Sequence, residues 1–304
     1  MENKFKEEIL KLKKEKDFVI IAHNYQIGDI QDVADFVGDS LELSRVIKDI
    51  DKKNVIFAGV RFMAETAKIL SPEKNIILPV PSAGCEMADM VEIEKVKKLQ
   101  EENKNAKTVC YVNTTALVKS ICDICCTSAN AVKVVNSLKE KEIIFLPDKN
   151  LAAFVRRNTD KKIISYEGFC YVHNQFNILD VRRAREKYTD ATIMIHPEAP
   201  EDVQLLCDVI LSTGGMVKYP KESKNNQFVV GTEEGMIYRL EKLYPDKKFF
   251  PLREKPKAIC NNMKKTTLED ILLSLRGEGG ENIFIEETIR LKALKSIEKM
   301  IEIL

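Results

Sequence analysis

The sequence has no tryptophan, only three histidines and almost no net charge. Its 48 basic and 47 acidic residues nearly cancel, which argues against nucleic acid or an anionic membrane as the main partner. No apolar run approaches the roughly 20 residues that a membrane span needs, and the charged, amphipathic N-terminus lacks the apolar region of a secretory signal. We therefore expect a cytoplasmic protein. No GxGxxG or Walker loop is present, so simple nucleotide binding is only weakly supported.

Cysteine, in contrast, is well represented, with eight residues in the chain. In a reducing compartment these thiols are not expected to form disulfides. Three of them follow apolar runs at wide and similar separations of 85 and 90 residues (170−85, 260−170): Cys85, Cys170 and Cys260. The chain of 304 residues exceeds the usual size of one domain, so two or three units are expected. One such cysteine would then belong to each of three units.

Short apolar runs rich in β-branched residues predict buried parallel strands. Nine runs are of this kind, three in each of three successive stretches: 18–22, 54–60 and 75–80; 107–110, 142–146 and 162–166; and 191–195, 227–230 and 248–252. Helical patterns separate them, including 29–36 and one from 86 to about 101. Alternation of strand and helix favours parallel sheets covered by helices on both faces.

Two sets of side chains recur in step with these strands. The first set ends the opening strand of each stretch, with separations of 88 and 85 residues (111−23, 196−111): His23, Tyr111 and His196. The second set begins a helix, with separations of 88 and 84 residues (128−40, 212−128): Ser40, Ser128 and Ser212. Such a long period indicates repeated domains rather than a solenoid.

The repeat predicts three pseudo-threefold-related three-layer α/β/α domains with parallel sheets around a central site. The expected boundaries are 1–105 for the first repeat with the N-terminal helix, 106–190 for the second, and 191–304 for the third. The third includes C-terminal closing helices at 267–275 and 286–303. In open α/β sheets ligands bind at the carboxyl ends of the strands, so the three cysteines are expected to meet at the centre.

Three thiolates are an unusual ligand set. Structural zinc and ferredoxin-type clusters take four ligands, often closely spaced, whereas three thiolates on a [4Fe–4S] cluster leave one iron open as a Lewis acid. Cys122 and Cys125 form a competing CxxC pair beside Cys126, but it stands alone and is expected to pack against the core. We also expect Cys110 and Cys207 in the core.

The chain resembles a known family, quinolinate synthase (NadA). The resemblance spans nearly the whole chain and rests on these stretches: Ala22-His-Asn-Tyr-Gln26, Val37-Gly-Asp-Ser40, Phe62-Met-Ala-Glu65, Gly84-Cys85, Tyr111-Val-Asn113, Cys126-Thr-Ser-Ala-Asn130, Pro147-Asp-Lys-Asn-Leu151, Cys170-Tyr-Val-His173, His196-Pro-Glu198, Ser212-Thr-Gly214, Gly231-Thr-Glu233 and Asn262-Met-Lys264. It implies a triangle of three α/β domains with a [4Fe–4S] cluster on Cys85, Cys170 and Cys260 and one iron open.

The resemblance also implies an enzyme of the transferase class in NAD biosynthesis. The family condenses iminoaspartate with dihydroxyacetone phosphate to give quinolinate, phosphate and water. L-aspartate oxidase or aspartate dehydrogenase would be the source of iminoaspartate. No nucleic-acid or membrane partner is implied.

The chemistry of this reaction suggests roles for individual side chains. We expect Tyr25 and Glu198 to act as an acid/base pair, with His23 and His196 orienting substrate carboxylates or phosphate. Hydroxyls at helix starts suit anion binding, although plain N-capping is the alternative for each: Ser40, Thr127, Ser128, Ser212 and Thr213. Tyr111 and Asn113 could hydrogen-bond the substrate, and His173 could bond to a cluster sulfide or to substrate.

Two other functions fit part of the pattern. A different [4Fe–4S] hydro-lyase acting on a small hydroxy acid would use the same open iron but would need no phosphate pocket. An iron–sulfur redox or oxygen sensor would normally carry a DNA-binding or partner module, for which the repeat leaves little room. Dependence on dihydroxyacetone phosphate distinguishes the first alternative from a quinolinate synthase.

Overall fold

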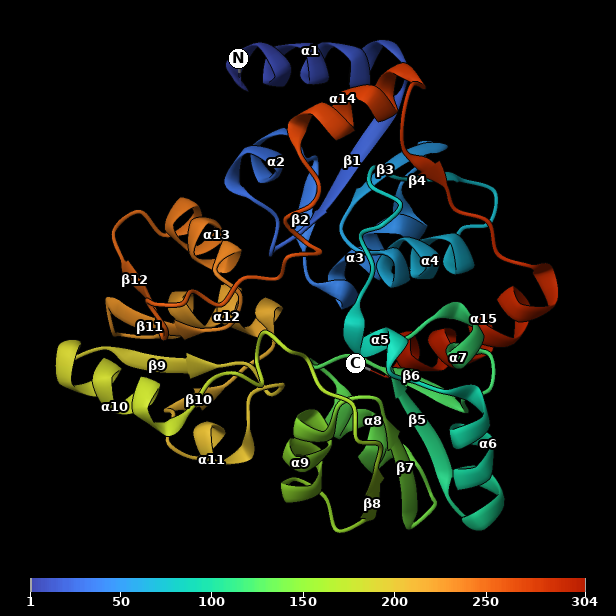
Figure 1. Cartoon of the computed structure of the whole chain (residues 1–304), viewed down its shortest axis with the longest axis vertical. Helices are drawn as coiled ribbons and strands as arrows, with labels where there is room; N and C mark the ends of the chain where they lie inside the picture. Colours follow the sequence, from blue (N-terminus) through green and yellow to red (C-terminus); the bar gives the residue numbers. More distant parts are fainter. Residues whose placement is uncertain (1, 304) are drawn as a thin grey trace.

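The structure, a computed structural model, describes residues 2–303 and contains three separate sheets covered by helices. The three sheets with their helices form the corners of a triangle (Figure 1). Each sheet is built mainly from one stretch of chain, so the colours pass from blue through green to orange around the triangle. This arrangement confirms the α/β fold class with three three-layer domains.

The first sheet has the strand order β13-β4-β3-β1-β2. Its parallel strands are β1 (Phe18–His23), β2 (Phe36–Gly38), β3 (Asn54–Ala58) and β4 (Asn75–Leu78). The last strand, β13 (Glu281–Asn282), pairs antiparallel with β4. Its helices are α1 (Glu2–Glu15), α2 (Gly28–Val33), α3 (Ser40–Asp49), α4 (Arg61–Leu70) and α14 (Leu268–Arg276). Helices on both faces bury β1 and β3 almost completely, which explains their continuous apolar sequences.

The second sheet has the order β6-β5-β7-β8 and the third has the order β10-β9-β11-β12. The strands of the second are β5 (Lys107–Tyr111), β6 (Ile124–Cys126), β7 (Glu142–Leu146) and β8 (Lys162–Ser165). The strands of the third are β9 (Thr192–Ile195), β10 (Val209–Ile210), β11 (Gln227–Gly231) and β12 (Lys248–Pro251). All of these strands are parallel.

The remaining helices follow the same alternation. They are α5 (Glu86–Asp89), α6 (Ile93–Glu102), α7 (Ala116–Lys119), α8 (Ala131–Ser137), α9 (Lys149–Arg157), α10 (Ile178–Lys187), α11 (Glu201–Gln204), α12 (Thr213–Glu222), α13 (Gly235–Leu243) and α15 (Glu287–Glu302). No helix within residues 2–303 combines the length and the apolar character that crossing a bilayer requires.

The three sheets share one topology. In each, the second strand of the unit lies at one edge, followed by the first, the third and the fourth strand. The direction of winding therefore changes beside β1, β5 and β9, and ligands of such sheets bind at the carboxyl end of this switch point. The carboxyl ends of all three sheets face the middle of the triangle (Figure 1).

Three features of the fold differ from the sequence-based prediction. The helix expected over 29–36 ends earlier, because α2 covers Gly28–Val33 and Phe36 begins β2. The edge strands β2, β6 and β10 were not expected, because each has only two or three residues and so carries no periodic signal. The helix expected from 86 to about 101 is divided into α5 and α6, which Met90, Val91 and Glu92 separate.

A second threefold feature lies where each edge strand begins. Three aspartates accept a hydrogen bond from a backbone N–H of the first strand: Asp35 from Ile20 (2.9 Å), Asp123 from Thr108 (2.9 Å) and Asp208 from Ile193 (2.7 Å). Each also pairs with a cation: Lys13 (2.8 Å), Lys107 (3.1 Å) and Arg185 (2.7 Å), respectively. We call these three residues the aspartate trio. They attach the edge strand to the first strand in the same way in every sheet.

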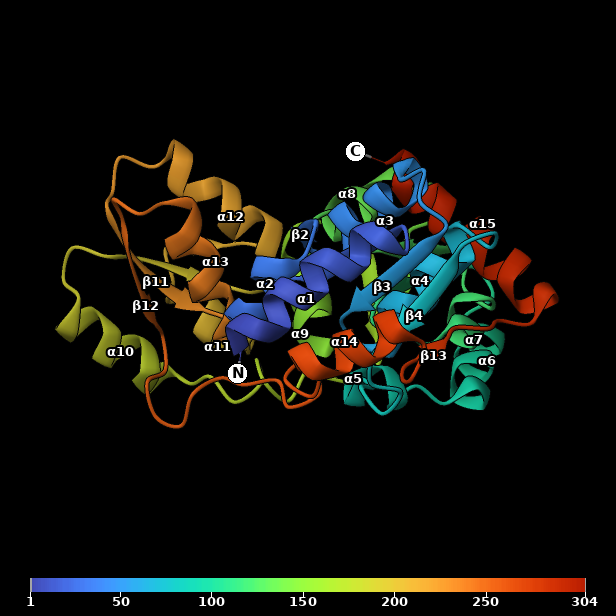
Figure 2. The same cartoon turned by 90° about the horizontal axis from the view of Figure 1, so that it is seen from above.

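The C-terminal elements, which the sequence groups with the third repeat, lie against the first two sheets. Helix α14 packs beside α1, and the two run side by side (Figure 2). Helix α15 packs on β6 and α7 of the second sheet. The domain boundaries at residues 105/106 and 190/191 stay predictions, and each falls between the strands of successive sheets.

Candidate active site

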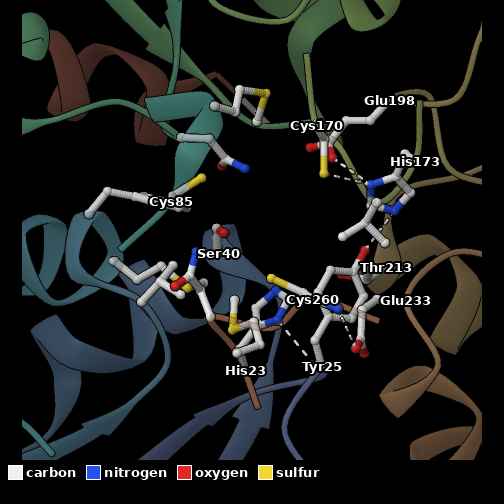
Figure 3. Close-up of a pocket in the computed structure, with 18 of the residues that line it drawn as sticks. His23, Tyr25, Ser40, Cys85, Cys170, His173, Glu198, Thr213, Glu233 and Cys260 are labelled. Carbon is white, nitrogen blue, oxygen red and sulfur yellow. Dashed lines mark hydrogen bonds and ion pairs between the residues drawn. The ribbon is translucent and has the colours of Figure 1, made fainter. Parts of the chain in front are cut away.

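A cavity lies in the middle of the triangle, and residues from all three sheets line it (Figure 3). All but one of the side chains proposed from the sequence are found there: His23, Tyr25, Ser40, Cys85, Tyr111, Asn113, Thr127, Ser128, Cys170, His173, His196, Glu198, Thr213 and Cys260. The exception is Ser212, whose hydroxyl accepts a hydrogen bond from Gly215 N (3.1 Å) and caps α12. Thr213, which is 85 residues after Ser128 (213−128), lines the cavity instead.

The strand ends supply equivalent positions with different chemistry. Tyr25, Asn113 and Glu198 each lie two residues beyond the strand-end marker of their sheet. The repeat therefore places a phenol, an amide and a carboxylate at equivalent points around one cavity. The fold thus brings an acid, a hydrogen-bonding group and a base to the same space.

Glu198 is a carboxylate of the cavity that bonds to two other side chains of the lining. It is buried, it accepts a hydrogen bond from Tyr111 Oη at 2.6 Å, and its Oε2 lies 2.8 Å from His173 Nδ1. Burial opposes its ionisation, but the imidazoles of His196 and His173 and the hydrogen bonds from His173 and Tyr111 hold the pKa of Glu198 below its ordinary value. Glu198 is therefore an anion at neutral pH and can accept a proton.

Tyr25 does not bond directly to Glu198. Its hydroxyl lies 2.5 Å from Thr232 Oγ1 and 3.4 Å from His173 Nε2. His173 thus stands between the two residues expected as an acid/base pair, with one ring nitrogen toward each. Burial, together with the charge of Glu198, raises the pKa of Tyr25 well above its ordinary value. Tyr25 therefore keeps its proton at neutral pH.

His23 and His196 have the same local geometry. In each, Nδ1 lies within hydrogen-bonding distance of the backbone N–H two residues later, at 3.2 Å for Tyr25 N and 3.4 Å for Glu198 N. Burial lowers the pKa of both imidazoles to about 3, so both are neutral at neutral pH. A neutral imidazole that accepts at Nδ1 carries its proton on Nε2. Both rings therefore offer an N–H donor to an anionic ligand.

The three cysteines approach the cavity from three sides, and their sulfurs point into the same space (Figure 3). Cys85 follows β4, Cys170 follows β8 and Cys260 follows β12. Burial raises the pKa of Cys85 to about 12. Burial also raises the pKa of Cys170, as do the nearby charges of Glu198, Cys85 and Cys260. Three half-buried thiols that repel one another when ionised are a donor set that fits a cationic metal group.

Three residues on one side of the cavity lie close enough together to hold a metal ion. One ligand atom from each of Cys170, His173 and Glu198 lies within 4.8 Å of the other two. Cys170 Sγ and His173 Nδ1 are 3.2 Å apart. The site is therefore compatible with metal binding.

The other cysteines lie outside the cavity lining. Cys110 and Cys125 are buried in the second sheet with their sulfurs 3.9 Å apart, and Cys125 Sγ lies 3.3 Å from Ser296 Oγ of α15. Cys122 donates to Val118 O at 3.1 Å. These thiols pack between a sheet and its covering helix, which agrees with the core position expected for the CxxC pair.

Comparison with known proteins decides the family. The family described as "Quinolinate synthetase A protein" matches residues 7–302. "Quinolinate synthase 2" of Methanosarcina acetivorans is 48% identical over 98% of this chain and 95% of its own length. Quinolinate synthases of Dehalococcoides mccartyi and Pyrococcus abyssi are 48% and 49% identical, covering 97% of this chain and 97% and 98% of their own lengths. The chain belongs to the quinolinate synthase family.

Membership in the quinolinate synthase family makes the protein an enzyme of NAD biosynthesis and does not favour the hydro-lyase or sensor alternatives. Sequence reasoning missed three further cavity-side groups. Asp39 and Glu233 line the cavity, and Thr232 bonds to Tyr25 and His173. Asp39 stands directly before a predicted helix, where an N-cap is common, and it does cap α3. Glu233 and Thr232 lie in the stretch Gly231-Thr-Glu233 that carries the family resemblance, but no local pattern marks either of them as a site residue.

Proposed function

We propose that this quinolinate synthase is a transferase that condenses iminoaspartate with dihydroxyacetone phosphate, giving quinolinate, phosphate and water. The observation that carries the proposal is the single cavity in which three thiols from three sheets face an ionised carboxylate and neutral imidazoles. Both substrates are anions, and the cavity offers them neutral N–H and O–H donors. Family membership supports the same reaction.

The proposed resident group is a [4Fe–4S] cluster held by Cys85, Cys170 and Cys260. When bound, such a cluster supplies one iron without a protein ligand, which is a Lewis acid for substrate oxygen. A single ion on Cys170, His173 and Glu198 is the alternative. It would leave the thiols of Cys85 and Cys260 in the cavity without a partner, so the three-cysteine set accounts for more of the lining.

The chain's own side chains would bind and orient the two anions. The Nε2–H groups of His23 and His196 can donate to carboxylate or phosphate oxygens. The hydroxyls of Ser40, Ser128 and Thr213 line the same cavity at or near the starts of α3, α8 and α12. Within residues 2–303, the buried Oδ1 of Asn113 has no hydrogen-bond partner and can accept from a substrate N–H.

Proton transfer is assigned to Glu198 and Tyr25. Glu198 is ionised and accepts a proton, whereas Tyr25 is neutral and donates one. His173 lies between them, 2.8 Å from Glu198 Oε2 and 3.4 Å from Tyr25 Oη. Once Tyr25 has donated its proton, a proton taken up at Glu198 can therefore reach the Tyr25 phenolate through one imidazole, which suits a reaction that shifts protons before water leaves.

Iminoaspartate must be supplied by an enzyme that oxidises L-aspartate at its amine, and an L-aspartate oxidase or an aspartate dehydrogenase would do so. The imine hydrolyses in water, so it has to be generated in the assay. The cytoplasmic location expected from the sequence stays a prediction.

The test is an anaerobic assay of reconstituted protein with iminoaspartate generated in place and quinolinate measured by chromatography. Quinolinate should form only when dihydroxyacetone phosphate is present. Iron and sulfide should each approach four per chain for a [4Fe–4S] cluster. An iron-loaded protein that forms no quinolinate, or that dehydrates a hydroxy acid without the triose phosphate, would contradict the proposal.

A further inference from the structure

The loop that carries each cavity cysteine is attached to the end of a neighbouring strand by the same backbone bond. In each domain, a backbone N–H just beyond the third strand donates to the carbonyl oxygen two residues before the cysteine. The three bonds are Arg61 N to Ala83 O (2.8 Å), Lys149 N to Gly168 O (2.8 Å) and Glu234 N to Ala258 O (2.9 Å). This clamp is complete in all three domains and fixes the start of each cysteine loop.

The residue directly before each clamp donor differs between the domains. In the second domain it is Asp148, whose Oδ2 accepts a hydrogen bond from Cys170 N at 3.2 Å. In the third domain it is Glu233, whose Oε1 accepts from Cys260 N at 3.0 Å. In the first domain it is Val60, whose side chain has no polar atom to accept a bond from the loop of Cys85. Two of the three cysteine loops therefore have a carboxyl attachment and one does not.

The two carboxyl groups are held from several sides. Both side chains are fully buried. The second oxygen of Asp148 accepts from Leu151 N at 2.6 Å, at the start of α9. The second oxygen of Glu233 accepts from Gly235 N at 2.7 Å, at the start of α13, and Lys264 Nζ lies 2.9 Å from the same carboxylate. Each group thus connects the N-terminus of a helix to the backbone of a cysteine.

Burying a carboxyl group is costly unless its oxygens are hydrogen-bonded. The first domain shows that the backbone clamp forms with valine at this position. A carboxyl group at the other two positions is therefore not required for the clamp itself. What it adds is a bond to the cysteine's own N–H, which restricts the orientation of the Cα–Cβ bond and hence the place of the sulfur.

We propose that Asp148 and Glu233 are positioning residues for the thiolates of Cys170 and Cys260. Cys85, whose loop has no such carboxyl attachment, is then the least firmly positioned of the three ligands. The proposal rests on the proposed function, because it takes the three cysteines as ligands of a [4Fe–4S] cluster. Groups that orient a ligand from behind typically change metal affinity by ~10–100-fold when they are removed. The two carboxyl groups would hold Cys170 and Cys260 in place, while the side chain of Cys85 could adjust its position.

The test uses the variants Asp148→Asn and Glu233→Gln in reconstituted, cluster-loaded protein. Each amide keeps the shape but has one acceptor oxygen where the carboxyl group had two. We expect full iron content after reconstitution, release of iron to a chelator about 10-fold faster than in the wild type, and a changed electron paramagnetic resonance spectrum of the reduced cluster. Hydrogen–deuterium exchange should speed up in the peptide containing Cys170 for Asp148→Asn only.

The matched control is Asp208→Asn, which removes a carboxylate that also accepts a strand N–H but belongs to the aspartate trio. Iron release and the resonance spectrum should stay as in the wild type. Wild-type release rates in a folded Asp148→Asn or Glu233→Gln protein would overturn the proposal, and either variant suffices if the other does not fold. A wild-type protein that takes up no iron and sulfide would instead refute the proposed cofactor.

Discussion

In all three sheets, the end where the edge strands begin keeps the same residues at equivalent positions, whereas the carboxyl end, which faces the cavity, does not. Where the edge strands begin, the aspartate trio repeats the same residue, the same backbone bond and a cationic partner three times. At the carboxyl ends, equivalent positions hold a tyrosine, an asparagine and a glutamate. Every domain needs the same bonds to hold its edge strand, whereas the chemistry proposed for the cavity needs different groups. We therefore expect substitutions at the outer end of the sheets, where the edge strands begin, to change stability. Substitutions at the inner end, around the cavity, should change function.

The largest effect that separates the two ends should come from Cys170→Ser. We expect loss of bound iron and at least a ~100-fold fall in kcat/KM, because removing a ligand exceeds the effect of removing its outer neighbours. The circular dichroism spectrum should be unchanged. Iron analysis and an anaerobic assay check this, and a variant that keeps its iron and activity would remove Cys170 from the ligand set.

The next effect should come from Glu198→Gln, which keeps the size of the side chain but removes the base. We expect kcat to fall by ~10²–10⁴-fold with iron content unchanged. Steady-state kinetics beside iron analysis separate the two readouts. If the variant loses iron together with activity, Glu198 holds the metal group rather than moving protons.

The histidines allow a test by pH, because all three lie at the inner end. Burial lowers the pKa of His196 to about 3, whereas an unfolded histidine titrates near about 6.5. Its contribution to stability is complete above the unfolded value and is lost as pH falls toward the folded value. His196→Gln should make the free energy of unfolding less dependent on pH, by about 1.4 kcal/mol per pH unit in that window.

Urea unfolding of cluster-free protein at several pH values between the two pKa values measures this slope. The wild type should lose stability more steeply than His196→Gln as the solution is acidified. Equal slopes would mean that the imidazole is protonated in the folded protein, and His196 would then be a cationic rather than a neutral donor.

At the outer end, Asp208→Asn should cost about 1 kcal/mol of stability, because its carboxylate bonds are partly exposed. The kinetic constants should not change. Asp35→Asn and Asp123→Asn should behave alike, since their bonds are equivalent. Thermal unfolding and steady-state kinetics provide the check, and a large loss of kcat in any of the three would contradict the division between the two ends.

The smallest effect should separate two neighbours at the start of α12. Ser212→Ala removes a cap and should lower stability by about 1 kcal/mol without changing KM. Thr213→Val keeps the shape of the cavity-lining side chain and should raise KM by ~2–10-fold through the loss of one hydrogen bond. If the two results are exchanged, the anion contact belongs to Ser212.

Much of the fold could be predicted because strands such as β1 and β7 are long apolar runs buried on both faces. The edge strands β2, β6 and β10 are too short to leave a pattern in the sequence, and only their pairing with β1, β5 and β9 defines them. The site residues could be found as a set because the repeat places strand ends together. Their pairing could not, since side-chain direction decides that Tyr111 rather than Tyr25 donates to Glu198.

The sequence repeat matched Ser128 with Ser212, whereas Thr213, one residue later, lines the cavity, and this shows another limit of the prediction. Ser212 and Thr213 are both hydroxyl residues at a helix start, and only the three-dimensional position distinguishes the cap from the cavity wall. Asp148 and Glu233 lie in stretches that carry the family resemblance, but the sequence does not show what they bond to, because a buried carboxyl group bonded to backbone atoms follows no periodicity. Such residues become visible only when equivalent loops are compared in space.

Because the three domains belong to one polypeptide, equivalent positions can carry different residues, which is impossible in an assembly of three identical subunits. In a ring of three identical subunits, every side chain near the axis would occur in triplicate, so a base could not face an acid there without two further copies. Joining the copies covalently frees each to mutate alone. One gene can then place a phenol, an amide and a carboxylate at equivalent positions around the same cavity.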